Sequence, residues 1–378
     1  MVEIRQLNPT RSNLKKFVEF QIDLYKGNPY FVPPLVSDEI ATLDSKVNPA
    51  FDHCESAYFM AYRDGKAVGR IAAMINKQVN EKENSRQARF GFVDFIDDAE
   101  VSKALFDAAE KWAKEKGMDN IVGPLGFTDL DNEGMLINGF EELGTMATIY
   151  NYPYYPAHVE RLGYEKEVDW HEFLIEIPEQ IPDKHKRIAE IVKKKFNLRV
   201  VKFTSRKALK EQYGQALFEL INEAYDNLYG YSRLTKRQID YYIKIYLGML
   251  NLDLVTLIVD GEDQLVGVGI SIQSMSRALQ KSKGKMFPFG WFHLAKALWF
   301  TKHPQILDML LVGVLPEYQD KGANALIFAD LIPEGSKDGY EWAETHHQLE
   351  DNDKSQTQWK NLDCIIHKKR CAYQKTLF

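Results

Sequence analysis

The stretch "VLPEYQDKGANALIFADL", residues 314–331, carries the strongest fold signal in the chain. It overlaps the end of the apolar segment "DMLLVGVL", residues 308–315, and finishes with helical spacing, so it predicts a strand that passes through a polar turn into a helix. Backbone N–H groups at a helix start lack intrahelical partners, and a glycine lets a ligand approach the backbone closely. The turn therefore predicts an anion site, although an ordinary turn with one glycine has the same pattern. The candidate residues are Gln319, Asp320, Lys321, Gly322, Ala323 and Asn324.

The bulk composition indicates a soluble protein of roughly two domains. The chain has 378 residues, 45% of them hydrophobic and 27% charged, with a net charge of -6 that argues against a nucleic-acid partner. Three scattered cysteines favour a reducing compartment, and the first residues lack the apolar core of a secretory signal. No apolar run is long enough to span a membrane. We therefore expect a cytoplasmic location.

Two halves with a similar order of elements follow one another. Each half reads as a strand and helix, then two strands, then a strand followed by a helix, then a strand, a helix and closing strands. The paired strands carry an Asp-Gly turn in both halves, which favours hairpins. Prolines and charges at residues 176–186 mark the boundary. We predict a mixed α/β fold with domains at residues 1–178 and 198–378, joined by a linker helix region at residues 179–197.

The order of elements, together with the turn, resembles the GNAT superfamily of N-acyltransferases. That family carries Gln/Arg-x-x-Gly-x-Gly/Ala after its fourth strand, and "VLPEYQDKGANAL" is similar: Gln319 and Gly322 match, while Asn324 replaces the last Gly/Ala. "NPYFVPPL" and "YNYPYYPAHVERLGY" in the first half resemble a bacterial subgroup of tandem GNAT-like proteins of uncertain function. The resemblance implies two tandem GNAT-like acyl-CoA N-acyltransferase domains.

The same resemblance implies where an acyl-CoA, most simply acetyl-CoA, would bind in the second half. The backbone N–H groups of Gly313 and Val314 would pair with the donor, and the segment "LEDNDKSQTQWKNL", which includes Asn352, would follow a strand that splays from its neighbour. In the first half the matching turn, residues 92–105, has no glycine and carries Asp97, Asp98 and Glu100 at the helix start, which would repel a pyrophosphate. We expect that half to be a degenerate copy that does not bind the donor.

Acyl transfer to an amine needs a proton acceptor for the amine and a proton donor for the departing thiolate. Glu344 and His346 fall on one face of the predicted strand "EWAETHHQL" and are candidate bases, although surface residues of an edge strand would show the same alternation. The tyrosine that GNAT-like enzymes often use as acid is replaced by Trp359, which leaves Tyr373 as a candidate. No metal-binding motif occurs, so we expect no metal.

The roles of two further segments, and the choice among three functions, stay open. The basic and aromatic insertion at residues 277–300 fits a packed inter-domain helix, an acceptor lid, a surface-binding helix or a dimer contact, and the tyrosine-rich segment at residues 224–235 lies where acceptor loops lie in the resembled family. The leading hypothesis is N-acylation of a primary amine in a small molecule or peptide. The alternatives are a non-catalytic acyl-CoA-binding or interaction module and a Fem-like transferase that uses aminoacyl-tRNA. The oligomeric state is open.

Overall fold

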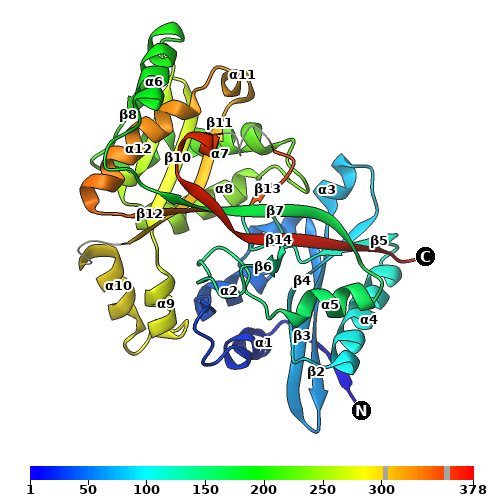
Figure 1. Ribbon diagram of the computed structural model, residues 1–378. Helices are drawn as coiled ribbons and strands as arrows, with labels where there is room; N and C mark the ends of the chain where they lie inside the picture. The colour runs from blue at the N-terminus through cyan, green and yellow to red at the C-terminus, as the bar shows by residue number, and fades with distance from the viewer. Residues whose placement is uncertain (301–304, 353–357) are drawn as a thin grey trace.

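The computed structural model describes residues 1–300, 305–352 and 358–378 and shows one mixed sheet that runs through both halves (Figure 1). The mixed α/β class predicted above is confirmed. Along the sheet the strands follow the order β1 (Glu3–Leu7), β2 (Cys54–Arg63), β3 (Lys66–Asn76), β4 (Gln87–Phe95), β5 (Asn120–Gly123), β14 (Cys364–Thr376), β7 (Glu165–Glu176), β12 (Trp342–Thr345), β11 (Ile306–Val314), β10 (Leu265–Gln273), β9 (Val255–Val259) and β8 (Arg199–Val201). The short β6 (Met135–Asn138) pairs with β14, and β13 (Gln348–Leu349) pairs with β7.

Helices cover both faces of this sheet (Figure 1). In the first half they are α1 (Arg11–Leu24), α2 (Val36–Leu43), α3 (Lys77–Lys82), α4 (Ala99–Glu115) and α5 (Tyr154–Arg161). The second half contains α6 (Asp183–Lys195), α7 (Arg206–Tyr225), α8 (Lys236–Tyr246), α9 (Ser276–Ser282), α10 (Gly290–Phe300), α11 (Pro316–Gln319) and α12 (Asn324–Asp338). Short 3-10 turns lie at η1 (Pro49–Asp52), η2 (Leu247–Met249), η3 (Leu252–Leu254) and η4 (Gln358–Asn361). No helix in these ranges is both long and apolar enough to cross a bilayer.

The two halves exchange their closing strands. β14, at the end of the chain, lies between β5 and β7, and Tyr373 of β14 is opposite Gly123 of β5. β7, which closes the first half in sequence, pairs on its other side with β12, where Ala343 is opposite Ile175. Each half of the sheet therefore depends on a strand from the other half, and a cut at the predicted boundary near residue 178 would separate paired strands.

Local sequence explains the ends of the elements that frame the first half. The hairpin between β2 and β3 turns at Asp64 and Gly65, whose φ angles of 50° and 77° are those of the tight turn that Asp-Gly favours. Helix α4 begins after Asp98, whose carboxylate accepts hydrogen bonds from the N–H groups of Glu100 and Val101. The start of this helix is thus capped by its own Asp98 side chain.

Candidate active site

Strands β11 and β12 run parallel and then separate. Their pairing extends from Ile306 opposite Trp342 to Met309 opposite Thr345, and the last bond joins the His346 N–H to the Met309 carbonyl at 3.4 Å. Beyond this point β11 continues to Val314 with β10 as its neighbour, whereas the chain after β12 turns to pair with β7 as β13. The separation opens a gap on one side of β11, as the resemblance implied.

A bulge in β11 sets which backbone groups face that gap. Met309 is opposite Ser271 and Leu311 is opposite Ile270, so Leu310 is an extra residue. An extra residue reverses the alternation of the strand, so the polar groups of Leu311 and Gly313 face β10 and those of Val312 and Val314 face the gap.

The partners of the two carbonyls agree with this assignment. The Val312 carbonyl accepts a hydrogen bond from the Tyr225 hydroxyl at 3.1 Å, and the Val314 carbonyl accepts one from the Gln319 side-chain amide at 3.0 Å. Tyr225 comes from α7 and Gln319 from α11, so neither partner belongs to a neighbouring strand. Beyond Met309, β11 therefore has no neighbouring strand on the side of the gap. An extended ligand could pair with its backbone there.

The gap opens into a cavity of about 600 Å³. Its wall is built from the end of β11, the turn into α12, the segment after β12, the tyrosine-rich segment, and a loop of the first half. Of the predicted donor-binding residues, those that line the cavity are Gly313, Val314, Gln319, Asp320, Asn324 and Asn352.

The other three predicted loop residues are turned toward α6 and the core. The Lys321 ammonium lies 4.3 Å from the centre of the Tyr318 ring. Gly322 has a φ of 76°, which requires glycine, and a Cβ there would lie 3.6 Å from Val192 of α6. Ala323 is completely buried. The cation of the loop therefore does not line the cavity, and any anion there would meet the backbone, Gln319 and Asn324.

The predicted catalytic residues are not brought together. His346 lines the cavity, and burial, with the charge of neighbouring His347, lowers its pKa to about 4. Glu344 is buried and bonds to Lys368, and it is not among the lining residues. Tyr373 lies in the core of the first half, where its hydroxyl donates to Glu160 at 3.0 Å. Of these candidates, His346 alone lies where a ligand in the cavity could meet it.

An acidic loop of the first half, missed by the sequence reasoning, forms one wall of the cavity. It carries Asp129, Asp131 and Glu133. Burial, with the charge of Glu133, raises the pKa of Asp129 to about 7, and burial raises that of Asp131 to about 6. Arg89 holds the loop in place: its guanidinium donates to the Gly126 carbonyl at 3.1 Å and, across the boundary between the halves, to the Gly230 carbonyl at 2.9 Å.

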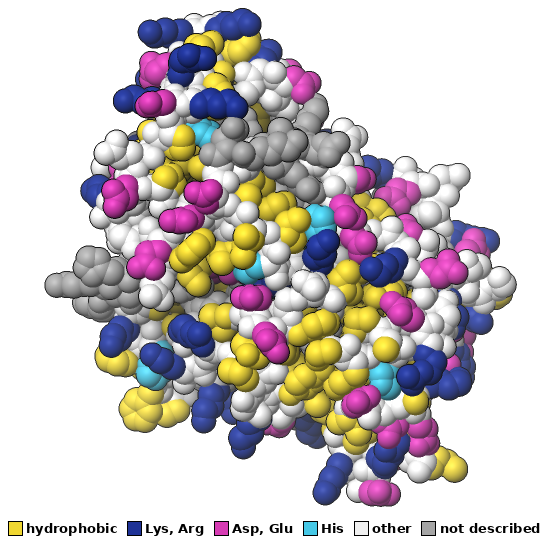
Figure 2. Space-filling view, viewed as in Figure 1, with side chains coloured by type: hydrophobic (Ala, Val, Ile, Leu, Met, Phe, Trp, Pro, Cys, Tyr) yellow, Lys and Arg dark blue, Asp and Glu magenta, His cyan; other side chains and the backbone are white. Residues whose placement is uncertain are grey.

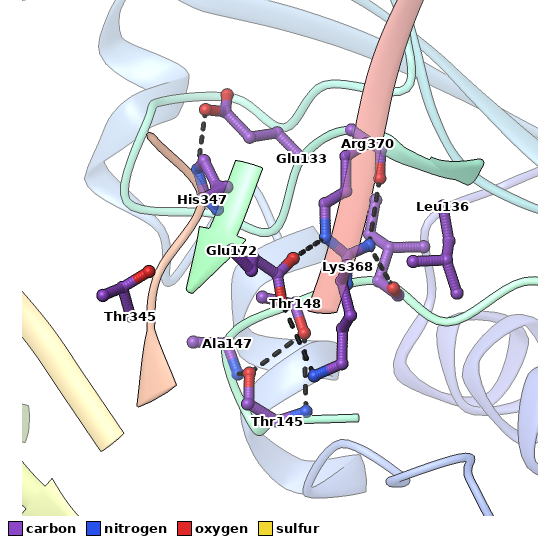
Figure 3. Close-up of polar contacts among 12 residues, drawn as sticks. Glu133, Leu136, Thr145, Ala147, Thr148, Glu172, Thr345, His347, Lys368 and Arg370 are labelled. Carbon is purple, nitrogen blue, oxygen red and sulfur yellow. Dashed lines mark hydrogen bonds and ion pairs between the residues drawn. The ribbon is translucent and has the colours of Figure 1, made fainter. Parts of the chain in front are cut away.

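His347 connects this acidic loop to the segment after β12. Its Nε2 lies 2.9 Å from Oε1 of Glu133, and both side chains line the cavity (Figure 3). Nδ1 of His347 has no hydrogen-bond partner among the described residues. A carboxylate that holds one imidazole nitrogen fixes the orientation of the ring.

The tyrosine-rich segment, residues 224–235, lies beside the acidic loop: the Ser232 N–H donates to Asp129 at 3.3 Å, and Trp170 contacts the rings of both Tyr229 and His347. Tyr225, Tyr229 and Tyr231 all line the cavity. Tyr225 donates to Val312, and the Tyr231 hydroxyl donates to Asn222 at 2.9 Å. The Tyr229 hydroxyl has no partner in the described part of the chain, and burial raises its pKa above the usual value. The Tyr229 hydroxyl is buried and keeps its proton.

Buried ion pairs join strands β7, β14 and β12 close to His347 (Figure 3). Glu172 of β7 pairs with Arg370 and Lys368 of β14, and Lys368 also pairs with Glu344 of β12. Burial opposes ionisation of Glu172, but the charges of Arg370 and Lys368 prevail and lower its pKa to about 2. Glu172, Glu344 and His367 offer atoms within 4.8 Å of one another, as metal ligands would. Because Arg370 and Lys368 together already neutralise the two carboxylates, this group fits an ion-pair network better than a metal site.

In the first half the end of β4 corresponds to the end of β11, and its backbone bonds to tyrosines of α5. The N–H of Phe95, at the end of β4, donates to the Tyr155 hydroxyl at 2.9 Å, and the Tyr154 hydroxyl donates to the Phe95 carbonyl at 2.5 Å. The rings of Phe95 and Tyr155 stack with centroids 4.3 Å apart. Two tyrosines thus bond to both the N–H and the carbonyl of Phe95.

Comparison with solved structures identifies the fold. A tandem GNAT protein from the clavulanic acid biosynthesis pathway, solved without acetyl-CoA, matches 100% of this chain and 99% of its own, with 12% identity and a TM-score of 0.57. A GCN5-related N-acetyltransferase from Sphaerobacter thermophilus matches 99% of this chain and 96% of its own, with 10% identity and a TM-score of 0.51. The chain matches no protein-family model. Its fold is that of a tandem GNAT protein, as the sequence predicted.

Two curated proteins are related to this chain in sequence. Protein YghO of Escherichia coli (strain K12) is 30% identical over 325 residues, which are 85% of this chain and 81% of that protein. A bacterial ceramide synthase of Caulobacter vibrioides (strain NA1000 / CB15N) is 30% identical over 314 residues, 82% of this chain and 80% of that protein. The chain belongs to the same family as these two bacterial proteins.

Proposed function

We propose that the protein is an N-acyltransferase that moves an acyl group from a CoA thioester to a primary amine. The observation that carries this proposal is the gap between β11 and β12, where the backbone of Val312 and Val314 faces a cavity of about 600 Å³. An extended pantetheine arm would add to the open edge of β11 as a strand adds to a sheet. Its pyrophosphate would lie at the start of α12, beside Gln319 and Asn324.

The acceptor would enter from the side of the first half. An alkylammonium ion needs negative charge for recognition, and Asp129, Asp131 and Glu133 supply carboxyl groups on that wall. The donor is a polyanion, so this wall would repel it. The two substrates therefore have separate ends of one cavity, and the degenerate first half would serve to complete the acceptor site.

His347, held by Glu133, would take a proton from the ammonium so that the neutral amine can attack the thioester carbonyl. The new C–N bond forms, the C–S bond breaks, and the thiolate leaves as CoA thiol after it receives a proton. Tyr229 is assigned as the source of that proton, in the role that the absent late-helix tyrosine plays in the resembled family. The overall reaction yields an amide, CoA thiol and one proton.

The relative from Caulobacter suggests a long-chain acceptor. A ceramide is an amide of a fatty acid with a long-chain amino alcohol, so a ceramide synthase forms the bond that this site is proposed to form. The apolar part of the lining, which includes Leu130, Leu228 and Leu311, suits alkyl chains. We therefore propose a long-chain amine as acceptor and a fatty acyl-CoA as donor, in place of acetyl-CoA.

The test combines a donor and an acceptor series. Purified protein is incubated with palmitoyl-CoA or acetyl-CoA and with sphinganine, hexadecylamine or glycine, while thiol release and amide mass are followed. The proposal expects the amide with palmitoyl-CoA and a long-chain amine, and little with glycine. Donor binding without amide from any pair would instead support the non-catalytic module. Failure to bind either thioester would refute the acyl-CoA assignment.

A further inference from the structure

The helix pair α9–α10 ends in a cluster of exposed apolar side chains. Figure 1 shows the pair projecting from one side of the molecule. The cluster, called the aromatic tip here, is exposed to a degree unusual for such residues. Its members and their exposed fractions are Met286 36%, Phe287 79%, Phe289 75%, Trp291 49% and Phe292 55%.

Positive charge surrounds the aromatic tip. Residues 274–298 contain five cationic side chains and no Asp or Glu, although the chain as a whole has a net charge of -6. All five are exposed, and in Figure 2 Lys and Arg side chains border the hydrophobic group at the lower left, over α9 and α10. This basic collar consists of Arg277, Lys281, Lys283, Lys285 and Lys296.

The base of the helix pair is fixed to the first half. The Gln280 side-chain amide donates to the Pro29 carbonyl at 2.8 Å and to the Phe31 carbonyl at 3.0 Å. The Val36 N–H donates to the Gly284 carbonyl at 2.9 Å, and Leu294 is buried in the core of the second half. The base of the helix pair thus contacts both halves of the protein. The side chains of the aromatic tip remain exposed.

We propose that the aromatic tip and basic collar bind an anionic lipid surface, with the aromatic side chains inserted at the headgroup level and the lysines against the lipid phosphates. Aromatic residues favour the membrane interface, and basic residues near it gain attraction to anionic lipids. A second copy of the chain fits less well, because a two-fold contact through this surface would bring two identical sets of cations together. The inference goes beyond the proposed function, since it depends on this surface alone.

The test is co-sedimentation of the full chain with large vesicles of phosphatidylcholine, with and without 30% phosphatidylglycerol. We expect binding to the anionic vesicles that weakens with salt. Phe287→Ser combined with Phe289→Ser should weaken it about tenfold or more. Lys281→Gln combined with Lys283→Gln should weaken it by roughly a factor of ten or more.

Matched control variants distinguish binding through this surface from non-specific binding to vesicles. Phe378 is 81% exposed and lies near Lys114, so Phe378→Ser removes an equally exposed phenylalanine beside a cation and should leave vesicle binding unchanged. Lys111→Gln combined with Lys207→Gln removes two exposed lysines elsewhere. The proposal is overturned if the wild type does not bind anionic vesicles, if tip and control variants bind alike, or if the tip variants convert a dimer to a monomer without changing vesicle binding.

Discussion

His347 and Glu133 are 214 positions apart in sequence, yet their side chains meet at 2.9 Å across the boundary between the two halves. His347 follows β12 of the second half, and Glu133 belongs to the acidic loop of the first. The cavity therefore has the proposed donor wall in one half and a candidate base whose partner comes from the other. This contact gives the degenerate half a chemical role in the proposed reaction.

Glu133→Gln should lower kcat by about 10²-fold or more, because the carboxylate that holds His347 in place as the proposed base is lost. Donor affinity should change little, since Glu133 lies on the acceptor wall. Steady-state kinetics and calorimetric titration with palmitoyl-CoA measure the two effects separately. Glu350→Gln is the control, because Glu350 faces His171 at 3.4 Å and neither lines the cavity. Equal loss of kcat in both variants would contradict the assignment of His347 as base.

Two single-charge changes at the start of α12 should shift donor affinity in opposite directions. Asn324→Asp keeps the side-chain shape and places an acid in the first helical turn, which helix dipoles favour, so the stability should hold. The added charge should nevertheless weaken acyl-CoA binding by at least about tenfold. Asp320→Asn should tighten binding, because it removes a negative charge from the cavity lining.

Asp338→Asn, at the other end of α12, changes the net charge of the protein by the same amount and should leave donor affinity unchanged. Calorimetry at fixed ionic strength measures all three variants. If Asn324→Asp binds the donor as the wild type does, the pyrophosphate does not lie at this helix start.

Arg370→Met should destabilise the protein by about 3–5 kcal/mol, because it leaves the fully buried Glu172 carboxylate without its strongest partner. The double variant with Glu172→Met should recover part of this loss, since a buried pair can be replaced by apolar side chains at low cost. Lys368, which also bonds to Glu172, limits the recovery. Denaturant unfolding of the four proteins measures the coupling. Additive losses would show that the two residues do not act as a pair.

Stability should fall as pH rises from about 4 to about 8, in part through Asp308. Burial, together with the charge of Glu344, raises the pKa of the Asp308 carboxyl to about 8 from the ordinary value of 3.8. In this window the folded state holds a proton that the unfolded state has released, so the stabilisation is complete below pH 4 and lost above pH 8. Asp308→Asn should lessen this fall when unfolding free energies at pH 5 and 8.5 are compared. An unchanged difference between the two pH values would contradict the raised pKa.

The sequence alone predicted the strand–turn–helix unit, because its apolar periods and the glycine at 322 are local features. The orientation of Val312 and Val314 was not predictable, since the extra residue Leu310 reverses the strand alternation without any change in the hydrophobic pattern. The prediction named Gly313 and Val314: the polar groups of Gly313 face β10, whereas those of Val314 face the gap. Lys321 likewise matches an anion loop by type, but its ammonium lies over Tyr318.

Long-range contacts limited the rest of the site prediction. Asp129 and Glu133 lie in a first-half loop with no motif, and only the packing of the halves brings them to the cavity. The exchange of β7 and β14 has the same cause: two halves with the same strand order offer equivalent partners, and period-two alternation does not choose between them. Tyr229 was within reach of sequence reasoning, because its tyrosine-rich segment had been noted as an acceptor loop.

The most direct test of the donor site is hydrogen–deuterium exchange, followed by mass spectrometry, with and without saturating palmitoyl-CoA. The account predicts protection of peptides that cover residues 310–315, where the backbone of Val312 and Val314 would pair with the pantetheine arm. Peptides that cover residues 90–96, the matching strand end already bonded to tyrosines, should not change. Protection of residues 90–96 instead, or unchanged exchange at residues 310–315 with the ligand bound, would contradict it.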